Sequence, residues 1–76
     1  MNSSTIRKKS NEYLHKRVRI KAKNGNIYTG FLVRVDDNKL LLRVTAISNG
    51  KKVQTAFFPF FLPLFFFDLF FIGLLI

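Results

Sequence analysis

The sequence contains no cysteine, only four carboxylate side chains and a single histidine among its 76 residues. Without cysteine there is neither a disulfide framework nor a thiolate metal site. The histidine, His15, stands beside Lys16 and Arg17, and a lone histidine in such a setting is far more often a surface residue than a base or a ligand. Asp36 and Asp37 are adjacent, so their side chains diverge and do not form an acid–base pair. A glycine-rich phosphate loop is also missing. The sequence therefore predicts a protein that is not an enzyme and has no cofactor.

Positive charge is plentiful, but it stops abruptly along the chain. Thirteen Lys and Arg give a net charge of +9, none of them lies after Lys52, and Asp68 is the only charged residue beyond that point. The excess of one sign indicates an anionic partner, either RNA phosphates or acidic lipid head groups. The alternative is a solvated face on which positive charge keeps an edge strand from pairing with another chain. A chain this short forms one domain with a marginal core, so oligomerisation or another support is expected.

The first eleven residues are polar and basic, and Arg7, Lys8 and Lys9 lie at their centre. They lack the apolar run of a secretory signal. We predict a flexible arm over residues 1–11, which is either a solvated tail or an arm that binds phosphate groups. A single helical turn is predicted over Ser10 to His15, capped by Ser10 or Asn11.

Strand periodicity begins at Arg17. Charged and apolar residues alternate over residues 17–23, which places Arg17, Arg19, Lys21 and Lys23 on one face. The following Asn24-Gly25 pair is typical of a type I′ hairpin turn, because both of its central positions need positive φ.

Three more strands are predicted after this turn, over residues 27–35, 40–47 and 52–57. Residues 36–39 form one connecting turn, and a second Asn-Gly pair, Asn49-Gly50, lies in the other. Gly30 interrupts the second strand, which predicts a bulge or a sharp bend. A short antiparallel meander with such a bend tends to curl, so the expected fold is mainly β, a small and strongly bent antiparallel barrel over residues 12–57.

The barrel segment resembles a known family. The pattern Val18-x-Ile20-x-Ala22-x-x-Gly25-x-x-Tyr28-x-Gly30-x-Leu32-x-x-x-Asp36 is similar to the first motif of the Sm-like proteins, which include bacterial Hfq proteins. The resemblance covers about residues 11–53. It implies an N-terminal helix, a bent five-stranded barrel, and rings of six or seven subunits that bind single-stranded RNA.

The resemblance also implies a base-binding turn. The family places an aromatic or apolar residue between an Asp and an Asn, whereas here the turn reads Asp36-Asp37-Asn38 and has no stacking residue. The resemblance implies that Asp36 and Asn38 contact a base; alternatively they only form the turn. Tyr28 is the candidate stacking residue before the C-terminal segment, or else a core residue. The second family motif is echoed by Phe71-Ile72-Gly73, without its arginine.

The last twenty residues, 57–76, contain nine Phe, five Leu and two Ile against one carboxylate, that of Asp68. As a helix they would span about 30 Å, close to the thickness of the hydrocarbon core. Insertion would be favourable by roughly 5 to 10 kcal/mol before penalties. However, Pro59 and Pro63 interrupt a helix. We predict a membrane-associated segment over residues 58–76, with the barrel on the cytoplasmic face. Its apolar contacts would come from Phe60, Phe61, Leu64, Phe65, Phe66, Phe67, Leu69, Phe70, Phe71 and Ile72.

A second interpretation of this segment stays open. Phe57 and Phe58 would finish the fourth strand, and residues 70–76 would supply a fifth strand that closes the barrel or forms a subunit interface in a cytoplasmic protein. Two function classes follow: an RNA-binding module, or a membrane-associated structural or adaptor protein. Neither uses a small-molecule substrate. The candidate RNA or anion contacts are Arg7, Lys8, Lys9, Arg17, Arg19, Lys21, Lys23, Asp36 and Asn38.

Overall fold

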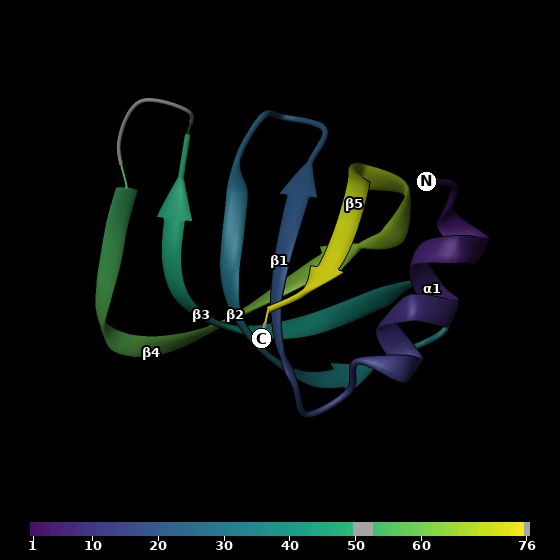
Figure 1. Cartoon of the computed structure of the whole chain (residues 1–76), viewed down its shortest axis with the longest axis horizontal. Helices are drawn as coiled ribbons and strands as arrows, with labels where there is room; N and C mark the ends of the chain where they lie inside the picture. Colours follow the sequence, from purple (N-terminus) through teal and green to yellow (C-terminus); the bar gives the residue numbers. More distant parts are fainter. Residues whose placement is uncertain (50–52, 76) are drawn as a thin grey trace.

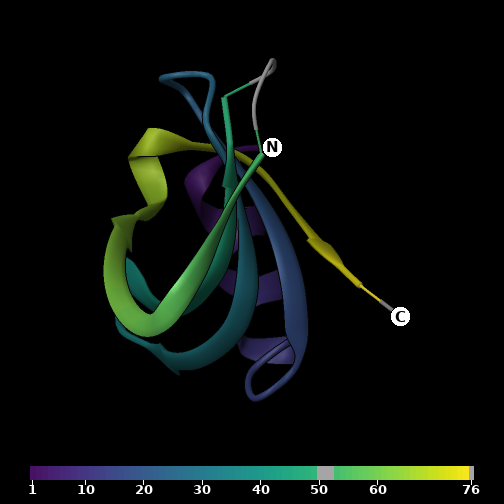
Figure 2. The same cartoon turned by 90° about the vertical axis from the view of Figure 1, so that its left-hand side faces the viewer.

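The computed structural model describes residues 1–49 and 53–75, with the backbone alone for residues 53–59. Helix α1 (Ser3–Glu12) is followed by strands β1 (Arg17–Ala22), β2 (Ile27–Val35), β3 (Lys39–Ser48) and β4 (Val53–Phe65), a 3₁₀ turn η1 (Phe66–Asp68), and strand β5 (Leu69–Leu74). The strands form one antiparallel sheet in the order β4-β3-β2-β1-β5. The sheet curls, and α1 lies across one end of it (Figures 1 and 2). In the described residues β4 and β5 remain unpaired edges, so the sheet is open and the predicted closed barrel is not observed.

Helix α1 begins much earlier than predicted. The side-chain oxygen of Asn2 caps it by accepting a hydrogen bond from the Thr5 amide at 2.8 Å. Ile6 and Ser10 are fully buried one turn apart, and the Ser10 hydroxyl donates to the Ile6 carbonyl oxygen at 2.7 Å. The segment predicted as a flexible arm is thus mostly helical. An N-terminal helix is confirmed, but the predicted start and cap at Ser10 or Asn11 are wrong. One apolar residue, Ile6, anchors the first turns, and it was too weak a periodic signal to predict a helix.

The hairpin between β1 and β2 is confirmed, but its turn type differs. Gly25 has φ of +93°, whereas Asn24 is not among the described residues with positive φ. The Gly25 amide donates to the Ala22 carbonyl oxygen at 3.0 Å, and the Ala22 amide donates to Asn26 at 2.9 Å. This is a three-residue loop whose last position is left-handed, and only that position requires glycine.

Strands β1, β2 and β3 lie where the sequence predicted them, whereas β4 begins near the predicted position and continues to Phe65. Strand β1 alternates without a break between exposed and buried side chains. Gly30 marks a register shift between β2 and β3, as expected for a bend. A Cβ atom at this position would collide with the carbonyl oxygen of Arg43, so the close approach of β3 requires glycine. The predicted turn at Asn49-Gly50 and the predicted start of the fourth strand at Lys52 involve residues 50–52, which lie outside the described residues.

The apolar C-terminal segment forms strands, which corrects the expectation of a helix. Strand β4 runs through the domain boundary predicted at residues 57 and 58, and β5 pairs with β1. This outcome matches the fifth-strand interpretation, with β5 over Leu69–Leu74, although β5 does not close the barrel. Pro63 lies in an edge strand, where proline is tolerated. Among the described residues, neither helical segment has the length and apolar character needed to cross a bilayer.

The predicted membrane residues divide into two groups in the sheet. Four of them are buried against the core, namely Leu64, Phe66, Leu69 and Ile72. The others are exposed, namely Phe60, Phe61, Phe65, Phe67, Phe70 and Phe71. Asp68 is also exposed, in η1. The segment therefore supplies part of the core and also an unusually aromatic surface.

Candidate functional site

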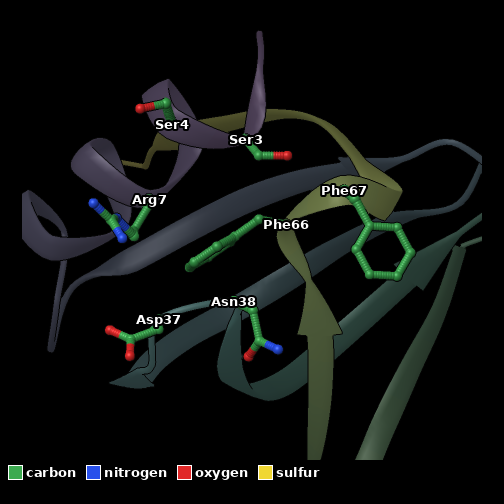
Figure 3. Close-up of a pocket in the computed structure, with 7 residues that line it drawn as sticks. All are labelled: Ser3, Ser4, Arg7, Asp37, Asn38, Phe66 and Phe67. Atoms are coloured by element: carbon green, nitrogen blue, oxygen red, sulfur yellow. The ribbon is translucent and has the colours of Figure 1, made fainter.

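A pocket of about 300 Å³ lies where α1, the β2–β3 turn and η1 meet (Figure 3). Each of these three elements contributes side chains of a different kind. Helix α1 brings hydroxyls and a guanidinium, the turn brings a carboxylate and an amide, and η1 brings two phenyl rings. The lining residues are Ser3, Ser4, Arg7, Asp37, Asn38, Phe66 and Phe67.

The turn and η1 are held together by the backbone. The Phe66 amide donates to the Asn38 carbonyl oxygen at 3.0 Å. The Phe66 ring is 3% exposed and lies between the helix and the turn in Figure 3. Because this ring is packed into the core, it fixes the position of η1 relative to the Asn38 side chain.

Phe67 points the other way and is 59% exposed, far more than its buried neighbour Phe66. Its ring stacks on that of Phe65, with 5.5 Å between the ring centroids and 29° between the planes. The Lys39 ammonium nitrogen lies 5.8 Å from the Phe65 centroid. Phe67 is therefore an accessible ring in a supported orientation, with a cation nearby.

The predicted base contacts have different surroundings. Asn38 lines the pocket, and an amide side chain can both donate and accept hydrogen bonds. Asp36 lines an adjoining open hollow together with Arg7, and its carboxylate oxygen forms an ion pair with Nε of Arg34 at 3.1 Å. Both partners are solvent-accessible, so this pair contributes little stability. The structure thus places Asn38 in the pocket and Asp36 beside it.

The predicted basic contacts do not all gather at the pocket. Arg7 lines it, whereas the β1 cations, including Arg17 and Arg19, are exposed along a face of the sheet and do not line it. Lys21 shares that face, Lys23 is exposed in the β1–β2 loop, and Lys8 is exposed on α1. The Lys9 ammonium nitrogen lies 5.9 Å from the ring centroid of Tyr13.

Sequence reasoning missed the aromatic part of the site. Tyr28, the stacking candidate, is 7% exposed, and its hydroxyl accepts a hydrogen bond from the Asn26 side chain at 3.2 Å. Phe31, on the same strand, is 40% exposed. Phe67 was assigned to a membrane segment, although its place directly after an edge strand puts it beside the β2–β3 turn. Only the fold reveals that proximity, because the two segments are distant in sequence.

The pocket combines three chemistries that suit a nucleotide. A guanidinium forms strong hydrogen bonds to phosphate oxygens, as Arg7 would. An amide such as that of Asn38 matches the polar edge of a base. An exposed phenyl ring such as that of Phe67 provides a stacking surface. Comparisons of the chain with protein-family models, with curated proteins and with solved structures find no match.

Proposed function

We propose that this protein is a non-enzymatic, Sm-like binding protein for single-stranded RNA whose apolar C-terminal segment completes its sheet and forms its subunit interface. The observation that carries the proposal is the pocket at which Arg7, Asn38 and Phe67 meet. The stacking residue that the turn lacks is supplied by η1. A helix followed by five strands is also the order that the sequence resemblance implies, which supports the proposal.

Phe67 provides the sharpest test of RNA binding. Replacing Phe67 by Ala is expected to weaken binding of a single-stranded hexanucleotide about tenfold, since stacking of one base contributes about 1–3 kcal/mol. Fluorescence anisotropy with a labelled oligonucleotide measures this change.

Two other pocket variants have different expected effects. Asn38→Ala is expected to reduce discrimination among bases, and Arg7→Gln is expected to lower the dependence of log K on log salt by about one unit.

Phe70→Ala is the matched control, because Phe70 is also an exposed phenyl (49%) but does not line the pocket. Its affinity for the hexanucleotide is expected to equal that of the wild type. If the wild type fails to bind RNA at low salt, the proposed function is wrong. Equal losses in Phe67→Ala and Phe70→Ala would remove the pocket as the binding site.

The two open edges of the sheet support self-assembly. An edge strand presents unpaired backbone groups that can pair with a strand of another copy. Phe65 is exposed on β4, and Phe71 is exposed on β5. Pairing of β4 in one copy with β5 in the next is a head-to-tail contact, and such contacts generate a ring when the rotation closes. We therefore include homo-oligomerisation through β4 and β5 in the proposal.

Leu74→Pro tests this assembly without disturbing the pairing of β5 with β1. The Leu75 amide donates to the Arg17 carbonyl oxygen at 2.9 Å, so the neighbouring Leu74 N–H points to the free edge. Proline removes that donor and is tolerated at edges. We expect the wild type to sediment as an oligomer, Leu74→Pro to sediment as a folded monomer, and the control Leu74→Thr to assemble. A monomeric wild type at micromolar concentration would contradict the interface.

Membrane association is the second candidate function, and the exposed phenyl groups favour it. Five phenyl groups on the C-terminal segment are exposed, namely Phe61, Phe65, Phe67, Phe70 and Phe71. The chain also has a net charge of +9, and exposed apolar groups combined with positive charge suit acidic lipid. Flotation with acidic vesicles separates the candidates. A full chain that floats with the vesicles and does not bind the hexanucleotide would replace RNA binding by this function.

A further inference from the structure

We propose that the outer face of the sheet carries a second, extended surface for single-stranded RNA, formed by four residues that we name the ladder: Arg17, Phe31, Arg43 and Phe61. The inference rests on the proposed RNA-binding function and extends it from one nucleotide pocket to a longer track. The ladder lies on β1 to β4, and none of its residues lines the pocket between α1 and η1.

The strand register places the four ladder residues in one row. Arg17 lies opposite Phe31, Phe31 lies opposite Arg43, and Arg43 lies opposite Phe61. Directly opposed residues in an antiparallel sheet point to the same face, and neighbouring strands lie about 4.8 Å apart. The row therefore alternates cation and ring across about 14 Å.

The ladder residues point away from the core. All four are exposed, and Phe31 and Phe61 are 40% and 57% exposed. Their sequence neighbours Val18, Leu32 and Leu42 are fully buried on the opposite face. Folding thus leaves the Phe31 ring in solvent between two arginines and the Phe61 ring in solvent beside Arg43.

Charge on this face is of one sign. The four carboxylates of the chain are Glu12, Asp36, Asp37 and Asp68, and they lie in α1, in the β2–β3 turn and in η1 rather than in the strands. Within the described part of the chain the one ion pair joins Arg34 to Asp36. Arg17 and Arg43 are therefore available to an external anion.

The alternation of cation and ring identifies the anion. Single-stranded nucleic acid offers a phosphate and a flat base at every unit, so guanidinium groups meet phosphates while bases stack on the rings. A duplex hides its bases, and a lipid head group has none to stack. The ladder therefore suits single-stranded nucleic acid better than it suits a duplex or a lipid head group.

Two features extend the track beyond the ladder. A hollow of about 320 Å³ lies beside it on the same strands, lined by Arg19, Ile27, Thr29, Ala46 and Ser48. Farther along β4, Lys39 lies opposite Phe65, whose ring stacks on Phe67 at the pocket. Phe65 thus links the ladder to the pocket, and one strand of RNA would reach both.

The test compares RNA of two lengths with the full chain. Anisotropy is measured for a hexanucleotide and for a strand of about 16 nucleotides, which is long enough to cover both surfaces. The double variant Phe31→Ala with Phe61→Ala is expected to bind the longer strand at least about tenfold more weakly and the hexanucleotide as the wild type does. Arg43→Gln is expected to lower the salt slope for the longer strand by about one unit. Phe70→Ala is the control for loss of an exposed phenyl, and sedimentation checks that assembly is unchanged.

The outcomes separate the ladder from the pocket. If the double variant binds both strands as the wild type does while Phe67→Ala loses the hexanucleotide, the ladder is overturned and the proposed function stands. If the double variant loses both strands and Phe67→Ala loses neither, the ladder stands and the pocket fails. No RNA binding by the wild type removes both. Unchanged RNA binding with loss of flotation on acidic vesicles would make the ladder a lipid surface and overturn the inference.

Discussion

Deleting Leu69 to Ile76 is expected to abolish the cooperative unfolding transition of the chain. Strand β5 pairs with β1 along its length and buries Leu69 and Ile72 at 1% and 0% exposure. Without β5, the core beside β1 opens to water, and a chain of 76 residues has little stability to spare. Circular dichroism during urea titration measures the transition.

Two point variants on β5 make this prediction quantitative. Ile72→Ala is expected to destabilise the fold by about 3 kcal/mol, since it leaves a cavity in the core. Phe71→Ala is the control: the adjacent side chain is 44% exposed, and its loss is expected to cost less than about 1 kcal/mol. A truncated chain that unfolds as sharply as the full chain would mean that this segment is an appendage, as a membrane anchor would be.

Replacing Gly30 by Val is expected to unfold the protein or to destabilise it by at least about 3 kcal/mol. The obstacle is backbone rather than a movable side chain: the added Cβ would meet the carbonyl group of Arg43 and the Cα of Val44. Strand β3 would have to move away, and the bend that lets the sheet curl would be lost. Thermal unfolding measures the change.

Gly25→Ala is the matched control for Gly30. A Cβ at Gly25 meets nothing within 4 Å, but the φ of +93° disfavours a side chain. The expected cost is about 1 kcal/mol, from backbone conformation alone. If Gly30→Ala were no more destabilising than Gly25→Ala, the close contact between β2 and β3 would be absent in solution.

Strand β1, which was predicted correctly, has faces of different polarity. In β1, Arg17, Arg19 and Lys21 alternate with Val18 and Ile20, so the residue types themselves show the period of two that is typical of a strand. In the part of β4 whose side chains are described, Phe61 and Phe65 are exposed and Leu64 is buried, so both faces carry apolar residues. The residue types then show no periodicity, because a strand, a buried helix and a membrane helix can all consist of such an apolar run.

The candidate site was only half predictable for a related reason. Asn38 came from the resemblance, because the turn and its neighbouring strands are contiguous in sequence. Phe67 reaches the same pocket through tertiary pairing, since β4 runs beside β3 and returns the chain to the turn. Phe31 was overlooked because a phenylalanine in a β-strand is ordinarily expected in the core, and only its register opposite Arg17 and Arg43 shows its face.

The most direct test of the proposed function is an NMR titration of the ¹⁵N-labelled full chain with a single-stranded hexanucleotide. We predict that the side-chain amide resonances of Asn38 and the backbone amide of Phe67 shift together and saturate with one affinity, while the amides of the β1–β2 loop around Asn24 stay unchanged. A titration in which RNA leaves Asn38 and Phe67 unperturbed, whatever else it moves, would contradict RNA binding at this pocket.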